Sequence, residues 1–208
     1  VEDALVRDVA CGQVQVQQQN GFFSFNTPIQ MPYLPLVQKF PEHPVTKGLE
    51  RVILQFASPL SYGGDARNVF TPLLLSSDKS ASENLPLVFD IQRQWTQSDF
   101  PQSNICMGGV LEGKIVGERS SRLIVYTDGD FPVGRGRNQQ INADNVSLLV
   151  NGIDWLSDDT GLIDLRTKAV DTRPIKELDD ATRSLYKYLN FLLPIGLILV
   201  YSFFRSSM

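Results

Sequence analysis

Ser121 to Phe131 reads SRLIVYTDGDF, and this stretch sets the expected fold. Leu123 to Tyr126 form a continuous apolar run, which is typical of a strand buried on both faces of a sheet. Thr127 to Phe131 then read as a turn at the carboxyl end of that strand. The other expected elements lie after and before this strand and its turn.

A helix and a further strand follow the turn. Residues 142–159 place apolar side chains at helical spacing, and Asn142 or Asp144 is a suitable cap for the start of the helix. Leu162–Val170 reads as a last strand. The order strand, loop, helix, strand is typical of α/β proteins, so we expect an α/β fold.

The upstream sequence supplies more strand candidates. Alternating valine and glutamine predict a half-exposed strand in GQVQVQQQ, residues 12–19. Three other runs read as strands, namely Arg51–Leu60, Asn68–Ser77 and Cys106–Val116, the last with glycines that permit close backbone approach. Residues 1–12 look like the end of a helix that runs into a strand, so we expect that an upstream part is missing.

Two stretches between these strands are predicted to be irregular. Five prolines between Asn26 and Pro44 predict a loop with room for one short helix at Leu36–Phe40. Asp78–Ser103 is polar, with room for one short helix or strand at Leu87–Trp95.

The carboxyl end of the chain is strongly apolar. Tyr188–Phe204 reads YLNFLLPIGLILVYSFF, seventeen residues without a charge, and as a helix it spans roughly 25 Å, slightly less than the apolar core of a bilayer. The alternative is a helix buried in the core of a soluble protein, but a run this apolar has no polar side for water. We therefore expect a juxtamembrane helix at 173–187, a transmembrane helix at 188–204, and contact with membrane lipid. More basic residues precede the run than follow it, which by charge alone places the body in the cytoplasm.

Composition excludes several classes of function. The 208 residues include 19 Lys+Arg and 23 Asp+Glu, for a formal net charge of -4 and a pI near 5.0. This balance offers no basic surface to nucleic acid, which we exclude as a partner. One His and two Cys cannot form a zinc site of standard spacing, and the chain has no phosphate-binding loop. We expect neither a metal nor a cofactor.

Two pairs of charged residues follow the strand that ends at Tyr126. Asp128 and Asp130 occupy the place where open α/β sheets usually bind ligands, and they are candidates for a divalent metal or a sugar nucleotide. Arg135 and Arg137 are candidates for binding an anion beside them. The alternative, which we favour, is a tight turn in which Asp accepts backbone N–H bonds, followed by a solvated loop.

No nucleophile and base can be paired from the sequence. His43, the only histidine, lies in a loop between two prolines. Cys11 and Cys106 lie in no activated setting, and they either pair as one disulfide in an exported protein or stay buried as free thiols. We therefore predict no catalytic residue and a protein that is not an enzyme.

Eight motifs occur in a fixed order between Leu5 and Arg205: LVRDVACGQV, MPYLPLV, HPVTKGLERVILQFASPL, TPLLLSS, LEGK, LIVYTDGDF, LLVNGIDWLSDDTGLIDLRTKAV and NFLLPIGLILVYSFFR. In this order they resemble the gliding-motility-associated auxiliary protein of ABC transporters. This substrate-binding-like protein occurs with an ATPase and a permease in Bacteroidetes and other bacteria. The resemblance covers almost the whole chain but corresponds only to the C-terminal portion, about half, of such proteins.

The resemblance implies a location and an architecture. Residues 1–172 would form a periplasmic α/β domain that lacks its N-terminal part. Its open, mostly parallel sheet would be similar to class I glutamine amidotransferase-like domains. The last helix would cross the bacterial inner membrane and end in the cytoplasm, which overrules the orientation from charge. The Asp128–Asp130 turn matches a family motif, but the resemblance names neither its ligand nor any catalytic residue.

Two classes of function follow. The favoured one is a non-enzymatic, membrane-anchored auxiliary subunit whose partners are the permease and ATPase of an ABC transporter associated with gliding motility. The alternative is a membrane-tethered module, or a degenerate enzyme, that binds a carbohydrate or another small ligand through Asp128 and Asp130.

Overall fold

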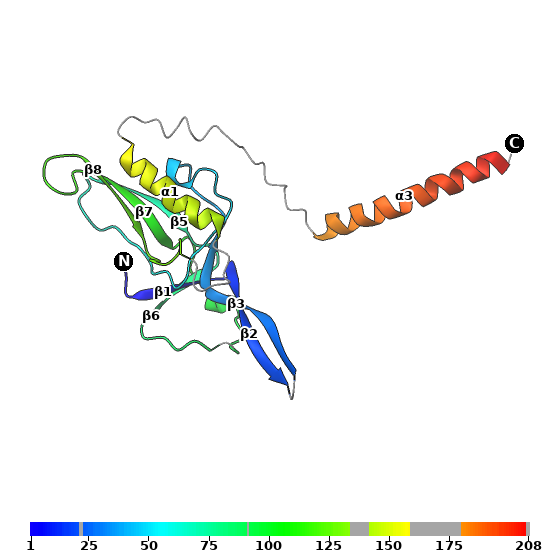
Figure 1. Ribbon diagram of the computed structural model, residues 1–208, viewed down its shortest axis with the longest axis horizontal. Coiled ribbons are helices and arrows are strands. Elements are labelled where there is room, and N and C mark those ends of the chain that lie inside the picture. Colours follow the sequence, from blue (N-terminus) through cyan, green and yellow to red (C-terminus); the bar gives the residue numbers. More distant parts are fainter. Residues whose placement is uncertain (21–22, 91, 134–141, 159–179, 207–208) are drawn as a thin grey trace. The chain divides into compact units, whose positions relative to one another are not determined.

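The computed structural model of the chain describes residues 1–20, 23–90, 92–133, 142–158 and 180–206 (Figure 1). The chain divides into two compact units, Val1–Asp171 and Thr172–Met208. In the described part of the first unit the strands form three small sheets, accompanied by one α-helix and two single-turn 3-10 helices.

The first sheet pairs β1 (Ala4–Asp8) with β6 (Ser80–Asn84) in antiparallel register. The backbone N–H of Val6 also donates to the carbonyl of Ala57 at 2.8 Å, and the Val6 side chain is fully buried. The predicted helix end at residues 1–12 is therefore wrong. The apolar residues Ala4, Leu5 and Val6 belong to β1, and all three are buried because both faces of this strand are covered.

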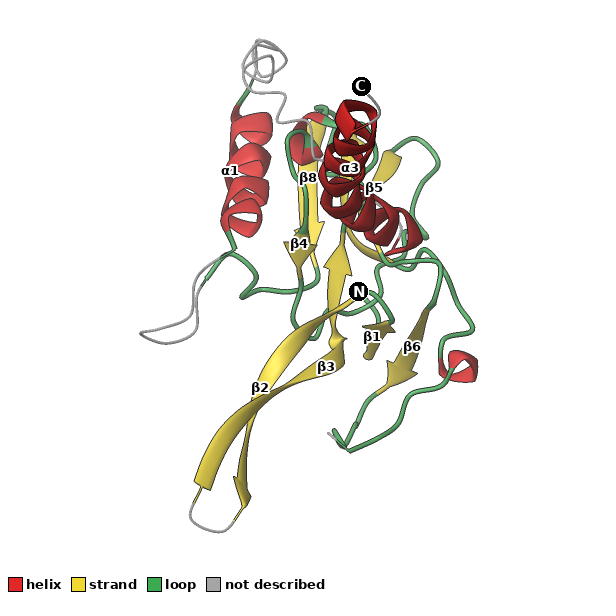
Figure 2. Ribbon diagram, turned by 90° about the vertical axis from the view of Figure 1, so that its right-hand side faces the viewer, coloured by secondary structure: helices red, strands yellow, loops and turns green. Residues whose placement is uncertain are grey.

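The second sheet is dominated by a long two-stranded ribbon, which consists of β2 (Cys11–Asn20) and β3 (Phe23–Val37). The short strand β4 (Val52–Ile53) joins it only at the far end of β3. Figures 1 and 2 show the ribbon extending away from the other strands of the unit. Gln13, Gln15 and Gln17 are exposed while the valines between them are half-buried, which confirms the predicted half-exposed strand.

The predicted loop at Asn26–Pro44 is wrong over most of its length, because β3 runs through three of its prolines. Pro28 lies opposite Gln15 in the ribbon. A proline is tolerated in a strand where its nitrogen faces an unpaired edge, since no N–H is needed there. Residues Leu36 and Val37, expected to start a short helix, are the end of β3, and the helical turn comes later as η1 (Pro44–Thr46).

The third sheet has the order β5-β7-β8, with β5 (Val69–Leu75), β7 (Cys106–Gly113) and β8 (Ser121–Tyr126). β5 and β7 fall within strands that the sequence predicts, and β8 contains the predicted strand Leu123–Tyr126 and begins two residues earlier. The glycines of β7 do allow close approach, because a Cβ on Gly109 would lie 2.6 Å from the ring of Phe70 on β5.

The helix α1 (Ala143–Ser157) confirms the predicted helix and its cap, since the side chain of Asn142 accepts from the backbone N–H of Asp144. It packs on β8, β4 and η1. The buried face of the helix shares one hydrophobic core with all three sheets: Val6, Val37, Val45, Val52, Leu54, Ala57, Leu73, Leu74, Met107, Val110, Phe131, Leu148 and Trp155.

The predicted open, mostly parallel α/β sheet is wrong, and with it the expected similarity to class I glutamine amidotransferase-like sheets. Every strand pair in the described residues is antiparallel. Among the described strands β8 pairs only with β7, so it lies at the edge of this sheet, and its first half is exposed. Its apolar run, Leu123–Tyr126, is explained by the helix α1 that packs on it and not by burial on two faces.

The second unit contains α3 (Asp180–Ser206), with Pro194 inside the helix. The predicted transmembrane helix at 188–204 is also wrong: no helix within the described residues is both long enough and apolar enough to cross a membrane. The uncharged run is shorter than a bilayer core is thick, and α3 continues past it into charged turns that include Asp180 and Lys187.

Some expectations fall outside the described residues. These are the last strand at Leu162–Val170 and the first part of the juxtamembrane helix, residues 173–179. The described part of Leu87–Trp95 forms neither helix nor strand; a 3-10 turn, η2 (Gln97–Asp99), follows it.

Candidate functional site

The turn after β8 is held by the carboxylate of Asp128. This side chain is 5% exposed. One oxygen accepts from the backbone N–H of Gln55 at 2.7 Å and the other from that of Asp130 at 2.9 Å. Asp128 therefore joins the end of β8 to the chain beyond β4, as the favoured turn interpretation requires.

Of the other three predicted site residues, the structure describes only Asp130. Asp130 is exposed, and its carbonyl accepts from the backbone N–H of Val133. Arg135 and Arg137 lie outside the described residues. Within the part that is described, no group of three or more His, Cys, Asp or Glu side chains could hold a metal ion. A ligand role for these four residues stays a prediction.

The start of α1 is fastened to β4 by amide and carboxylate side chains. The buried side chain of Asn145 accepts from the N–H of Ile53 and donates to the carbonyls of Ile53 and Phe131. One oxygen of Asp144 accepts from the N–H groups of Glu50 and Arg51. Asn145 thus pairs with β4 as a neighbouring strand would. The sequence predicts the cap of this helix, but not that side chains of its first turn bond to a strand about 90 residues earlier in the chain.

A hollow of about 580 Å³ lies between the ribbon, β4 and the start of α1. Four successive residues of β2 line it, so it borders the backbone of that strand and not only one face. None of its lining residues is charged; they are apolar or carry side-chain amides: Gly12, Gln13, Val14, Gln15, Met31, Leu34, Ile53, Gln55, Phe56, Phe131, Val133, Asn142 and Asn145. The hollow offers hydrogen bonds and apolar contacts but no acid or base.

A cluster of rings, which we call the aromatic patch, consists of Tyr33, Phe56, Phe89 and Trp95. The Phe89 ring lies 4.9 Å from that of Tyr33 and 5.2 Å from that of Phe56, and Trp95 lies 5.9 Å from Tyr33, all between centroids. Phe56 and Phe89 are nevertheless exposed. Phe56 has a φ of 53°, a left-handed backbone that costs free energy for a residue with a bulky side chain.

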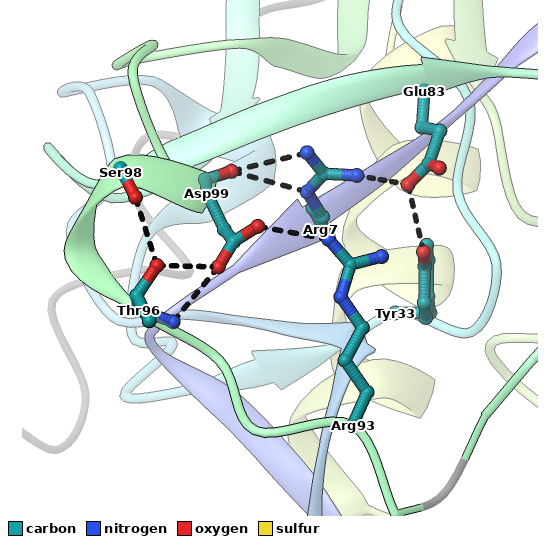
Figure 3. A network of polar contacts seen from close by, with 7 residues as sticks. All are labelled: Arg7, Tyr33, Glu83, Arg93, Thr96, Ser98 and Asp99. Atoms are coloured by element: carbon teal, nitrogen blue, oxygen red, sulfur yellow. Dashed lines mark hydrogen bonds and ion pairs between the residues drawn. The ribbon is translucent and has the colours of Figure 1, made fainter.

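A polar network supports the aromatic patch from β1 (Figure 3). The guanidinium of Arg7 is paired with Glu83, and its Nε and Nη2 donate to the carbonyl of Asp99 at 3.2 and 3.1 Å. Tyr33 donates its hydroxyl to Glu83 at 2.9 Å. Burial is the main cause that raises the pKa of Tyr33, so it remains a neutral donor.

The same network fixes the segment that carries Trp95. The Asp99 carboxylate accepts from the backbone N–H and hydroxyl of Thr96 and from Arg93. These bonds lower the pKa of Asp99 to about 2, and the bond from the backbone N–H of Thr96 has the largest effect. The guanidinium carbon of Arg93 lies 4.1 Å from the centroid of the Trp95 ring, and that of Arg7 lies 5.6 Å from it. Both guanidinium groups thus lie over the Trp95 ring within the distance of a cation–π contact.

The sequence gives only a weak sign of the aromatic patch. Asp78–Ser103 is polar on average, and that average conceals Val88-Phe89 and the Arg93-x-Trp95 spacing. Tyr33 and Phe56, which complete the patch, come from stretches that are distant along the chain.

The histidine and cysteines show no catalytic arrangement. His43 Nδ1 accepts from the N–H of Val45 at 3.2 Å, its ring lies 5.2 Å from that of Trp155, and burial lowers its pKa. Cys11 and Cys106 are free thiols, half-buried, and burial is the main cause that raises the pKa of each. Raised thiol pKa values disfavour the nucleophilic thiolate.

Comparison with known proteins gives one match. Residues 1–152 match the model of a family described as "ABC-type uncharacterized transport system". Neither the curated proteins nor the solved structures contain a match to the chain.

Proposed function

Because the chain belongs to the auxiliary family of ABC-type transport systems, we propose that it acts without catalysis of its own, as a subunit that binds the membrane component of its transporter through the aromatic patch. Membership makes it an auxiliary component of such a system. The contact surface on this chain, the subunit that it binds and the cellular location are our proposal.

The exposed part of the aromatic patch, Phe56 and Phe89, is the observation that carries this proposal. Exposed aromatic side chains on a rigid support are typical of protein interfaces, where aromatic and arginine residues supply much of the binding energy. Val88, next to Phe89, is 96% exposed, and Leu85 is exposed as well. The network around Arg7 and Asp99 holds this surface in place before any partner binds, which lowers the entropy cost of association.

The chemistry of the described residues supports a role in binding over one in catalysis. Both oxygens of Asp128 accept backbone N–H bonds, so the carboxylate is already used in the turn. The hollow beside the ribbon has no titratable side chain. These observations give no support to the alternative module that binds a small ligand through Asp128 and Asp130.

The partners that we propose are the permease and, through it, the ATPase of the same transport system. We place the body in the periplasm of a bacterium, at the inner membrane, in a complex of the type associated with gliding motility. In this arrangement the ATPase hydrolyses ATP, and the auxiliary subunit couples that hydrolysis to transport through its contact with the permease.

The experiment compares two exposed valines. Val88→Asp places a charge beside the aromatic patch, next to Phe89, while Val116→Asp places the same charge on the turn after β7, where the valine is 83% exposed. Each variant is expressed with the permease and the ATPase, and the complex is isolated through a tag on the permease. We expect Val88→Asp to reduce recovery of the chain at least about tenfold, because burying an unpaired charge in an interface is costly, and Val116→Asp to leave recovery unchanged.

Two results contradict the proposal. One is that the unmodified chain does not copurify with a permease. The other is that both variants copurify as the unmodified chain does, since the aromatic patch is then not the contact surface.

A further inference from the structure

Within the described residues, the ribbon has one edge without a partner strand and one edge that prolines interrupt. β2 pairs with β3 and with no other described strand. Pro28 has no N–H to donate to β2, so its backbone nitrogen must face away from that strand. In an antiparallel pair, opposite residues share this orientation. Gln15, opposite Pro28, therefore also turns its N–H and C=O outward, and Gln13 and Gln17 do so by alternation.

Native edge strands usually carry devices against pairing with another chain, above all lysines and prolines. β2 has neither. No side chain from Val9 to Gln38 is charged, so the whole ribbon is neutral in a chain of net charge -4. A two-stranded ribbon is at best marginally stable alone in water, and a third or fourth strand is the usual remedy. The outer edge of β2 is thus equipped to accept a strand.

The sequence of β2 identifies the strand that fits. Gln13–Gln17 reads QVQVQ, which is the same in both directions. When two copies of β2 lie antiparallel about a two-fold axis at Gln15, every glutamine faces a glutamine and every valine faces a valine. The outward-facing residues 13, 15 and 17 then meet 17, 15 and 13 of the other copy, so each pair can exchange two backbone hydrogen bonds.

We propose that the chain forms a two-fold symmetric dimer by pairing β2 with β2 of a second copy, with Gln15 on the axis. The two ribbons become one four-stranded sheet. Val14 and Val16 of one copy meet Val16 and Val14 of the other, a favourable cross-strand pair. The prolines in β3 interrupt the far edge of the ribbon and disfavour a second pairing there, so we expect the assembly to stop at two copies instead of growing into a fibre.

The surroundings of the edge agree with this occupant. The hollow borders β2 from Gly12 to Gln15 and has no charged lining residue. In the proposed register, residues 17 and 18 of the second copy lie beside Gln13 and Gly12. No charged side chain of the hollow therefore opposes an uncharged strand laid along β2, and side-chain amides are available on both strands.

The first test is a pair of proline variants of the 208-residue chain. Gln15→Pro removes an outward N–H from β2, and Asn26→Pro, opposite Gln17, removes an outward N–H from β3. Sedimentation velocity over a concentration series gives the dissociation constant of the dimer. We expect Gln15→Pro to raise that constant at least about tenfold, because two intermolecular hydrogen bonds are lost, and Asn26→Pro to leave it unchanged. Melting temperatures show whether each variant is folded.

The second test identifies the occupant. Gln15→Glu and Gln15→Lys each place like charges opposite one another on the axis and should each raise the dissociation constant about fivefold. An equimolar mixture of the two should form a heterodimer in preference to either homodimer. The same substitutions at Asn26 should change nothing.

Three results overturn the inference. They are a chain that stays monomeric at its highest soluble concentration, Asn26→Pro weakening the dimer as much as Gln15→Pro, and a Glu and Lys mixture that shows no preference for heterodimers. A strand of another protein as the true occupant gives the first and third results.

Discussion

Two buried carboxylates serve as connectors in this protein. Asp128 bonds to the N–H groups of Gln55 and Asp130. Asp8, fully buried at the end of β1, accepts from the N–H of Ala10 and from the N–H and hydroxyl of Ser77. A carboxylate has two oxygens and accepts several bonds, so it can join separate segments where a neutral side chain joins fewer.

Asp8 should make stability depend on pH. Burial, the main cause, raises its pKa above the usual 3.8 even though bonds from Ser77 and Ala10 oppose the shift. Because the folded protein holds this proton more tightly than the unfolded chain does, the contribution of Asp8 to stability is fully present below pH 3.8 and is lost as the pH rises through the folded pKa. As the pH rises from 3.8 through the folded pKa of Asp8, we expect the free energy of unfolding of the unmodified chain to fall relative to that of Asp8→Asn.

Urea titrations of both proteins at a series of pH values measure this difference. Asp8→Asn changes the bonds to Ser77 at every pH, so only the slope against pH is informative. A difference that stays constant, or that rises with pH, contradicts the assigned direction of the pKa shift.

At the scale of elements, α1 crosses β8 at a glycine. Gly152 is buried in the middle of the helix, and a Cβ there would lie 2.8 Å from the hydroxyl of Tyr126 and 3.2 Å from Ile124. A glycine inside a helix costs about 1 kcal/mol relative to alanine. That cost is explained by the close approach, which lets the Tyr126 hydroxyl reach the carbonyl of Leu148.

Gly152→Ala should therefore destabilise the protein although it improves helix propensity. We expect the free energy of unfolding to fall by about 1–3 kcal/mol, the usual cost of overpacking a core. Tyr126→Phe removes the nearest atom, so adding Gly152→Ala to Tyr126→Phe should cost less than adding it to the unmodified chain. A double-mutant cycle by urea unfolding measures the coupling, and strictly additive effects would show that the hydroxyl is not the obstacle.

The elements that local patterns specify were predictable, and their pairing was not. Alternation in β2, the apolar run of β8 and the cap at Asn142 are all visible in short windows of sequence. The direction of pairing depends on contacts across long separations, such as Ala4 with Asn84. β3 was missed because prolines argue against a strand unless the partner of each backbone nitrogen is known, as at Pro28.

The candidate site shows the same division. The Asp128 turn was visible as a motif, and its bonding to Gln55 was not, because Gln55 belongs to a distant segment. The aromatic patch draws on Tyr33, Phe56 and Phe89, which come together only through the packing of β3, β4 and the segment after β6. No spacing rule along the chain connects them.

At the scale of the whole first unit, one core connects three small sheets. Val6 of β1, Leu54 beyond β4, Val110 of β7 and Trp155 of α1 belong to the same cluster of buried side chains. The two-stranded sheet of β1 and β6 is at best marginally stable by itself, and the buried faces of the two three-stranded sheets belong to the same core. The unit should therefore unfold as one cooperative body.

A single-tryptophan variant tests this cooperativity. The chain has two tryptophans, and Trp95→Phe leaves one of them, Trp155 on α1. The midpoint of urea unfolding from Trp155 fluorescence should coincide with the midpoints at which the amide signals of Val6 and Val110 disappear from NMR spectra. An earlier midpoint for Val6 would mean that the β1–β6 sheet unfolds on its own.

The neutral ribbon also determines which chemical probes can report on it. Arg7 is the last basic residue before the ribbon and Lys39 the first one after it, so trypsin releases the whole ribbon as one peptide, Asp8–Lys39. Amine-reactive cross-linkers find no lysine there, and a dimer joined by β2 would produce no lysine cross-link within the paired strands. Deuterium uptake of the single peptide Asp8–Lys39, followed against protein concentration, is the direct mass-spectrometric measure of whether the ribbon is paired.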